Sequence, residues 1–370
     1  MRALIFLSII ALANYHVVAR IFAYAPVDRI HWLIPVIIAL LFFGLEILDL
    51  RTTFLQTYPA LKLLISATTG AFFCALFFVM ASDLFFIVVR HFVENQILLK
   101  TSLFYFILIA TALSTAIGVV QATAGPKLKE VTIAIKNLPP AFEGYKIVQV
   151  SDLHVGGTIR KPYVQNVVDI VNSADADLIA LTGDFADGKV TDLRQDSALL
   201  ADMKSKDGSY FVTGNHEYYH DLFSWLPFYK SIGIEVLQNE NRIIRRGEDA
   251  LVIAGVTDYS TRGLAPPEGV DIARAGKDMP QDAVKVLLMH QPNQYKEAAA
   301  AGFDLQLSGH THGGQFFPWT LVVPFFHNYF KGLNRFENLQ IYISVGTGYW
   351  GPALRTFVPT EVTLITLRKE

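Results

Sequence analysis

The stretch Lys146-Ile-Val-Gln-Val-Ser-Asp-Leu-His154 begins as an apolar strand and ends in two residue types that bind metal ions. Its β-branched residues predict a buried strand over Lys146–Val150. Asp152 and His154 come next, two positions apart, so both side chains can face one ion at the end of the strand. An Asp-x-His sequence is common by chance, and its meaning depends on the residues at the ends of the other strands of the chain.

Four later apolar runs are followed at once by polar residues of the same kinds. Because the carboxyl ends of strands in an α/β fold meet around one crevice, residues far apart in sequence converge there. Carboxylate and amide oxygens combined with imidazole nitrogens suit divalent Mn, Fe or Zn rather than Ca. The four motifs are Gly183-Asp184-Phe-Ala-Asp187, Gly214-Asn215-His216-Glu217, His290 and Gly309-His310-Thr-His312.

Each motif also has an ordinary structural explanation when it is taken alone. A lone His290 is more often a hydrogen-bonded core residue, and the residues from Gly214 to Glu217 could form a turn and a helix cap. Asp187 either orients a metal ligand through a hydrogen bond or is a solvated turn carboxylate. The joint occurrence of the motifs, in order and each after an apolar run, indicates one site.

From Tyr145 onward, short apolar runs alternate with amphipathic segments, which predicts an α/β domain with sheets buried beneath helices. Residues 125–140 form a short connector with a first strand around Val131–Ile135. The other predicted strands are Lys146–Val150, Leu178–Leu181, Tyr210–Val212, Leu251–Ala254, Val284–Leu288, Leu305–Leu307, Ile341–Ser344 and Val362–Leu367. The predicted helices are Pro162–Asn172, Leu193–Met203, Phe223–Ser231 and Asn293–Ala301.

The complete series of motifs resembles the calcineurin-like metallophosphoesterase family, and the resemblance extends from about Tyr145 to the C-terminus. The run from Gly309 to Gln315, Gly-His-Thr-His-Gly-Gly-Gln, is similar to a bacterial branch of membrane-associated members. The resemblance implies a four-layer α-β-β-α sandwich with two divalent metal ions (Mn, Fe or Zn) at one edge.

The resemblance also implies a role for each residue of the site. Asp184 would bridge the two ions, and His216 would contact the phosphate and donate a proton to the leaving group. Asp184 and His216 are therefore the predicted catalytic residues. Two ions activate water and neutralise the phosphoryl oxygens, which is most of what phosphoryl transfer requires. The remaining ligands are Asp152, His154 and His312 for the first ion and Asn215, His290 and His310 for the second.

The first third of the chain has the composition of a membrane segment. Of the 31 Lys and Arg and 33 Asp and Glu residues, 12 lie in residues 1–125 and the other 52 in residues 126–370. A helix needs about 18–20 apolar residues to cross a bilayer. We expect a transmembrane region of four helices over residues 1–125 and a catalytic domain over residues 126–370. The four apolar runs are Ala3–Phe22, His31–Leu48, Leu61–Val89 and Ser102–Ala122.

Three alternatives bear on this membrane assignment. The apolar runs could be buried helices of a large soluble core, although four such runs with so few charges would be unusual there. The first run, with Arg2 before it and Ala11-Leu-Ala13 within it, could be a cleaved signal peptide. Glu46 and Asp83 within the runs could belong to a transport pathway, but near helix ends a structural role is the simpler interpretation.

The basic residues beside the predicted spans give a weak orientation. By the positive-inside rule, a margin of one charge favours a cytoplasmic catalytic domain. The chain is predicted to be an integral protein of a bacterial inner membrane. The compared residues are Arg2, Arg51, Lys62, Lys127 and Lys129 on one side and Arg20, Arg29, Arg90 and Lys100 on the other.

Charge and cysteine content exclude other classes of site. The net charge is −2 and no basic cluster or RNA-binding signature is present, so no nucleic-acid partner is expected. Cys74 is the only cysteine, which rules out a disulfide within the chain and a cysteine-based metal site. The sequence does not indicate an oligomeric state.

Aromatic residues crowd two segments, 218–229 and 316–329, directly after the Asn215 and His312 motifs. They either pack in the core or form a hydrophobic lip that admits an acyl or isoprenoid tail. Since a membrane tether concentrates the enzyme near membrane-borne substrates, we expect hydrolysis of phosphodiester or pyrophosphate bonds in a phosphorylated lipid or lipid-linked substrate. The alternatives are a phosphomonoesterase acting on proteins or small molecules, and a non-catalytic membrane receptor or transporter that binds a phosphorylated ligand.

Overall fold

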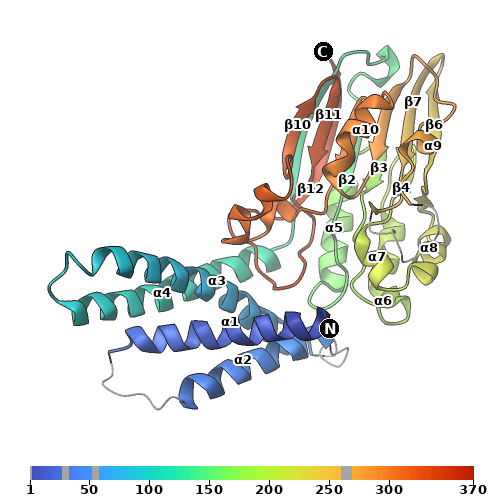
Figure 1. Cartoon of the computed structure of the whole chain (residues 1–370). Coiled ribbons are helices and arrows are strands. Elements are labelled where there is room, and N and C mark those ends of the chain that lie inside the picture. Colours follow the sequence, from blue (N-terminus) through green and yellow to red (C-terminus); the bar gives the residue numbers. More distant parts are fainter. Residues whose placement is uncertain (1, 27–32, 52–57, 260–268) are drawn as a thin grey trace. The chain divides into compact units, whose positions relative to one another are not determined.

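The computed structural model of the chain describes residues 2–26, 33–51, 58–259 and 269–370 (Figure 1). The chain divides into two compact units. The helical unit contains the residues up to Thr123 together with two later segments, Phe316–Pro318 and Gly351–Thr356. The sheet unit contains Ala124–Gln315, Trp319–Trp350 and Phe357–Glu370.

Four apolar helices make up most of the helical unit. Among the described residues, three stretches are long and apolar enough to cross a membrane: Leu7–Tyr24, Pro59–Val89 and Gln96–Thr123. In the fourth helix the apolar stretch is shorter, Leu33–Leu45, so three of the four predicted spans are supported and the fourth crossing stays a prediction. The helices are α1 (Arg2–Tyr24), α2 (Leu33–Arg51), α3 (Pro59–Val89) and α4 (Gln96–Thr123).

Asp83 has a structural partner inside the helical unit. The Arg20 guanidinium of α1 donates to both carboxylate oxygens of Asp83 on α3, at 2.6 to 3.0 Å, and the Tyr24 hydroxyl donates at 2.6 Å. These bonds join α1 to α3, which gives Asp83 a structural role. The Glu46 side chain and residues Arg29 and His31 lie outside the described residues.

The sheet unit contains two six-stranded mixed sheets. The first has the order β1-β12-β2-β3-β4-β5, in which β2 to β5 run parallel and β12 pairs antiparallel with β2. Its last strand in sequence, β12, lies between β1 and β2 and runs parallel to β1. The strands are β1 (Lys127–Ile135), β2 (Lys146–Val150), β3 (Leu178–Leu181), β4 (Ser209–Phe211), β5 (Glu235–Val236) and β12 (Glu361–Lys369).

The second sheet has the order β10-β11-β9-β8-β7-β6. Its four central strands run parallel, and an antiparallel strand closes each edge. The strands are β6 (Glu240–Arg246), β7 (Asp249–Gly255), β8 (Val284–Leu288), β9 (Leu305–Ser308), β10 (Gly332–Phe336) and β11 (Leu339–Ile343).

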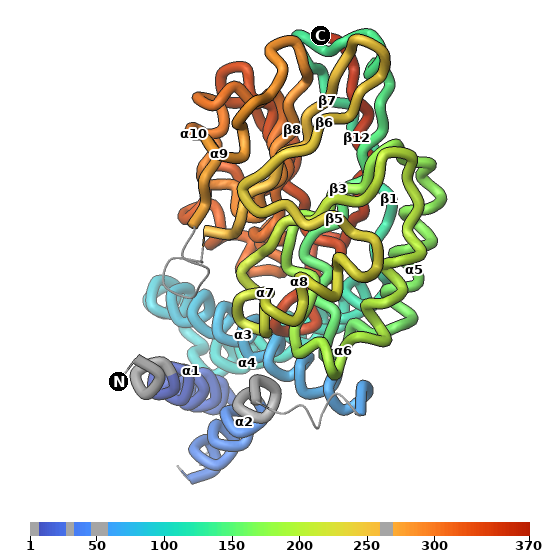
Figure 2. Tube along the Cα trace, turned by 90° about the vertical axis from the view of Figure 1, so that its right-hand side faces the viewer, coloured from blue at the N-terminus to red at the C-terminus, as the bar shows by residue number. Residues whose placement is uncertain are grey.

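Helices connect the strands of both sheets, and Figure 2 shows α9 and α10 on one side of the strands and α5 on the other. Pro162 lies in the first turn of α5, where its missing N–H leaves no helical hydrogen bond unmade. The helices are α5 (Lys161–Ser173), α6 (Val190–Ser197), α7 (Asn215–Tyr219), α8 (Leu222–Ser231), α9 (Ile272–Ala275) and α10 (Tyr295–Ala300).

The two sheets share one buried core. The cluster takes Ile147 and Leu178 from the first sheet and Ile253, Val286 and Leu307 from the second. A second cluster joins the second sheet to α9 and α10. The mixed α/β class predicted from the sequence is confirmed, and the four-layer order stays a prediction.

The sequence predicted the buried strands better than the exposed ones. The bounds of β2, β3 and β8 are those predicted, and the other predicted strands are found within a few residues. The strands β5, β6 and β10 were missed. Since β6 and β10 are edge strands with alternating partial exposure and charged residues, they lack the apolar run that marks a buried strand.

The shared core generates a stability prediction. Leu307 is fully buried between the sheets, so Leu307→Ala should lower the free energy of unfolding by about 2–5 kcal/mol. Leu333 on the edge strand β10 is 45% exposed, and Leu333→Ala should cost less than about 0.5 kcal/mol. Thermal unfolding of the full chain in detergent measures both, and equal losses would contradict a core between the sheets.

Candidate metal centre

The predicted site residues come from the carboxyl ends of parallel strands in both sheets. Asp152 and His154 follow β2, Asp184 follows β3, and Asn215 begins α7 just after β4. His290 follows β8, and His310 and His312 follow β9. All seven predicted ligands therefore lie on the loops that strand direction brings together.

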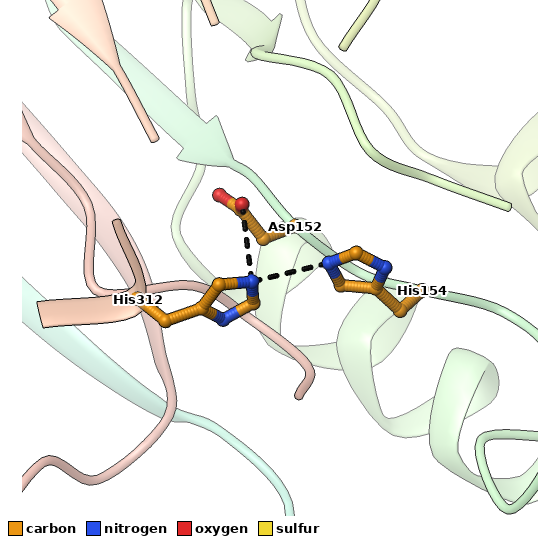
Figure 3. A group of neighbouring side chains, drawn as sticks. All are labelled: Asp152, His154 and His312. Atoms are coloured by element: carbon orange, nitrogen blue, oxygen red, sulfur yellow. Dashed lines mark hydrogen bonds and ion pairs between the residues drawn. The ribbon is translucent and has the colours of Figure 1, made fainter. Parts of the chain in front are cut away.

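Three of these side chains form a first group, shown in Figure 3. The Nε2 atoms of His154 and His312 are 3.1 Å apart, and His312 Nε2 is 3.4 Å from Asp152 Oδ1. All three residues are buried. Two imidazole nitrogens and a carboxylate oxygen thus point at one position, as a cation would require.

A second group contains Asp184, His290 and His310. His290 Nε2 lies 3.0 Å from Asp184 Oδ2 and 3.2 Å from His310 Nδ1. Asp184 also lies 4.0 Å from His154 of the first group. Asp184 thus lies within 4.0 Å of a histidine of each group, which fits the bridging role that the resemblance implies for it.

In the imidazole rings of His290 and His154, a hydrogen bond to one nitrogen determines which nitrogen faces the ligand group. His290 Nδ1 donates to the Thr182 carbonyl oxygen at 2.8 Å, and His154 Nδ1 lies 2.9 Å from Asp187 Oδ1. A proton on Nδ1 leaves the lone pair of Nε2 facing the site. This arrangement is typical of metal-ligating histidines.

A buried amide oxygen fits the role of a metal ligand. Among the described residues, Asn215 Oδ1 is buried without a hydrogen-bond partner, which costs free energy unless a ligand occupies it. The backbone approaches both carboxylates closely: a Cβ added to Gly309 would lie 2.1 Å from Asp152 Oδ2, and one at Gly214 would lie 2.1 Å from Asp184 Oδ1. Only glycine fits at these two positions.

The backbone of the site is strained in the way that functional sites often are. Five of the seven predicted ligands adopt a positive φ, which residues other than glycine disfavour. The surrounding hydrogen bonds must hold these conformations in place. The five are Asp152, His154, Asp184, His310 and His312, with φ from 49° to 70°.

Glu217 makes several of the hydrogen bonds that keep the backbone of the site in this conformation. The sequence did not single it out as a functional residue. Its fully buried carboxylate accepts backbone N–H groups of Asp184 at 3.1 Å, Phe185 at 2.7 Å and Gly214 at 2.7 Å. Burial and the nearby charge of Asp184 raise the pKa of Glu217 to about 7. Its place in the Gly-Asn-His-Glu motif was the one feature of the sequence that could have indicated a role in the site.

His216 is beside the two groups, paired with Asp187. Its Nδ1 lies 2.6 Å from Asp187 Oδ1, the same oxygen that contacts His154, so Asp187 orients two imidazoles and is not merely a solvated turn carboxylate. Burial opposes charge on His216, but Asp187 and Asp184 outweigh it and raise the pKa of His216 to about 9. The two carboxylates thus favour the imidazolium form, which is the form that donates a proton.

The loop after β11 also borders the site, and no sequence motif predicted this position. The N–H groups of Thr347 and Gly348 donate to the carbonyls of Ser151 and Asp152 at 2.7 and 2.9 Å. Two residues further on, the Trp350 indole lies edge-on to the His216 ring, with centroids 5.7 Å apart.

Glu217 generates a prediction. Glu217→Gln replaces one acceptor oxygen by an NH₂ group that cannot accept a backbone N–H, and it should cost about 1–3 kcal/mol of stability. The exposed Glu297 on α10 offers a matched control, because Glu297→Gln leaves no buried group unpaired. Thermal unfolding of both variants measures the difference, and a Glu217→Gln protein as stable as the control would contradict the role of this carboxylate.

Comparisons with known proteins show which family the chain resembles. Residues 145–314 match the calcineurin-like phosphoesterase family model. The chain is 37% identical over 270 residues to a "Transmembrane protein with metallophosphoesterase domain" of Danio rerio, covering 71% of this chain and 62% of that protein. It is 32% identical over 244 residues to an "Uncharacterized metallophosphoesterase" of Aquifex aeolicus, covering 65% of this chain and 92% of that protein.

A third relative, an "Uncharacterized metallophosphoesterase" of Helicobacter pylori, is 35% identical over 255 residues, covering 68% of this chain and 66% of that protein. The chain spans about three fifths of the length of the vertebrate relatives in Danio rerio and Bos taurus. Because relatives occur in both vertebrates and bacteria, the predicted bacterial branch is not specifically supported. With its apolar helices, the protein is a membrane protein that belongs to the calcineurin-like metallophosphoesterase family.

Proposed function

We propose that the protein is a membrane-anchored phosphodiesterase or pyrophosphatase that uses two divalent metal ions. The observation that carries this proposal is the convergence of two ligand groups, Asp152 with His154 and His312, and Asp184 with His290 and His310. Asn215 would complete the second group with its buried amide oxygen. Divalent ions bound there would supply an activated water molecule and neutralise charge on the phosphoryl oxygens.

The chain's own residues provide the remaining chemistry. His216, held by Asp187, donates a proton to the oxygen of the departing group. Asp184 is fixed by the backbone N–H of His216, which donates to Asp184 Oδ1 at 2.8 Å. The proton donor and the predicted bridging carboxylate are therefore positioned by one hydrogen bond, and this pre-organisation favours the transition state.

The substrate we propose is a phosphorylated lipid or lipid-linked pyrophosphate. The two aromatic segments are divided between core and surface: Trp225 and Tyr229 are buried, whereas Phe325 is 86% and Phe326 72% exposed. Trp319 and Leu321 are also exposed beside them in sequence. Such a cluster of exposed apolar side chains in a membrane protein supports contact with an acyl chain or the bilayer surface. The proposed location is the cytoplasmic face of a bacterial inner membrane.

The catalytic proposal predicts different failures for two variants. With Mn²⁺ added, the full chain in detergent should hydrolyse bis(p-nitrophenyl) phosphate faster than p-nitrophenyl phosphate and bind about two ions per chain. Asp184→Asn should lose bound metal and activity together. His216→Ala should keep its metal and lose about 10²–10⁴ in kcat, the usual contribution of a general acid.

Metal content by mass spectrometry and initial rates measure these outcomes. Equal activity in all three proteins would contradict catalysis at this site. A preference for the monoester would favour a phosphomonoesterase, and metal binding without turnover of either ester would favour a receptor.

The lipid proposal predicts a substrate-specific effect of the exposed aromatics. Replacing both Phe325 and Phe326 by serine should raise KM at least about tenfold for a phospholipid or a nucleotide-activated diacylglycerol, because each buried phenyl ring contributes about 1.5–3 kcal/mol. Turnover of bis(p-nitrophenyl) phosphate should not change. Leu333→Ser, on the partly exposed edge strand β10, is the control. Equal effects on lipid and soluble substrates would count against a lipid substrate.

A further inference from the structure

Two histidines at α7 are spaced so that both can bind one metal ion. His216 and His220 are four residues apart, and the His220 N–H donates to the His216 carbonyl at 3.0 Å, so the helical turn extends to His220. Residues at positions i and i+4 of a helix lie on one face. The two imidazole rings accordingly lie near each other, with centroids 6.0 Å apart.

The run His216-Glu-Tyr-Tyr-His220 has the His-Glu-x-x-His spacing with which a helix binds zinc in metalloproteases. In those enzymes the glutamate acts as a general base. Here the carboxylate of Glu217 is fully buried and accepts three backbone N–H groups, so its oxygens are already engaged. The run therefore supplies a pair of histidines that can bind an ion, without the glutamate base of a protease.

Asp187 brings a carboxylate to the same two rings. One ligand atom from each of Asp187, His216 and His220 lies within 4.8 Å of the other two. Asp187 Oδ1 lies 2.6 Å from His216 Nδ1, and the Asp187 N–H donates to the Val155 carbonyl at 2.8 Å, which fixes its backbone. The three side chains thus converge, as they do in the two ligand groups already described.

This third group keeps atoms available for an ion. Both hydrogen bonds of the Asp187 carboxylate involve Oδ1, which leaves Oδ2 without a partner among the described residues. None of the described residues hydrogen-bonds to a ring nitrogen of His220. The Asp187 side chain is 24% exposed and His220 is half-buried, so an ion can enter from solvent.

The donor set determines which ions suit the third group. Two imidazoles and a carboxylate favour zinc and similar transition metals over magnesium and calcium, which prefer oxygen ligands. Asp187 Oδ1 also lies 2.9 Å from His154 Nδ1, so an ion in the third group is close to an ion of the first group. Because the two cations repel each other, we expect the third group to bind its ion last and more weakly.

We propose that Asp187, His216 and His220 form a third metal site, which binds Zn²⁺ when the ion is in excess and thereby inhibits the enzyme. Binding of the ion does not depend on the proposed function. The inhibition does rest on it, because it requires that His216 contact the substrate. An imidazole whose ring nitrogen binds Zn²⁺ cannot offer that nitrogen to an oxygen of the substrate. Excess zinc then stops turnover through a residue that belongs to both sites.

The zinc stoichiometry of the full chain in detergent tests the site without turnover. At saturating Zn²⁺, equilibrium dialysis should show about one ion more per wild-type chain than per His220→Gln chain, because glutamine is a poor ligand for zinc. Thermal unfolding gives a second readout, since an ion that binds only the folded state raises Tm. Zn²⁺ added after the first two groups are filled should raise the Tm of wild type but not that of His220→Gln.

His327→Gln is the matched control for both measurements. Like His220, His327 is half-buried and packs beside a histidine of the metal centre, in this case His310, with ring centroids 5.9 Å apart. Its Nδ1, however, lies 3.0 Å from the amide oxygen of Asn293, which is a weaker zinc ligand than a carboxylate. His327→Gln should therefore keep the wild-type zinc stoichiometry and the rise in Tm.

Inhibition is measured with the Mn²⁺-loaded full chain and bis(p-nitrophenyl) phosphate. His220→Gln should raise the zinc concentration for half inhibition at least about tenfold, since changing one residue around a bound metal costs about 10–100-fold in affinity. Without added zinc, wild type and His220→Gln should turn over at similar rates. Exchange of Mn²⁺ for Zn²⁺ in the first two groups would affect both proteins alike, so only their difference reports on the third site.

The outcomes separate the site from its effect. Equal zinc stoichiometry of wild type and His220→Gln would overturn the third site. An additional ion that depends on His220 but leaves hydrolysis unchanged would uphold the site and overturn the inhibition. An additional ion that depends on His220, in a protein that hydrolyses no ester, would support the site while refuting the proposed function.

Discussion

The metal centre depends on buried carboxylates that accept backbone N–H groups from neighbouring loops. Asp152 accepts the His310 N–H at 2.9 Å, Asp184 accepts the His216 N–H at 2.8 Å, and Glu217 accepts those of Asp184 and Phe185. A buried carboxylate is costly unless such bonds satisfy it. Each bond therefore offsets desolvation and ties two loops together, which holds the ligand conformations that have a positive φ.

This dependence explains why the residues of the site could be predicted from the sequence more completely than their supports. Each predicted ligand follows an apolar strand, and strand direction alone brings it to a common edge. Glu217 and Trp350 could not be found in this way, because their roles come from bonds to backbone groups and from contact with a ring that only the folded chain brings near. Asp187 left two interpretations open until its oxygen was found between two imidazoles.

The membrane third shows a similar limit. Composition was enough to predict apolar helices, and three reach the length of a span. Composition could not reveal that Gly70 of α3 and Gly118 of α4 leave room for the Leu354 side chain, because a glycine in an apolar helix does not show which side chain it faces. Nor could it reveal that residues 316–318 and 351–356 pack with the helices, because neither segment is long enough to carry a hydropathy signal.

The position of β12 has a consequence for biosynthesis. This strand follows all the other described strands in sequence, yet it separates β1 from β2 in the first sheet. The ribosome must therefore release residues 361–369 before β1, which comes just after α4, can find its neighbour. Until then the nascent chain displays unpaired strand edges at the membrane, where chaperones or the insertion machinery would have to shield them from aggregation.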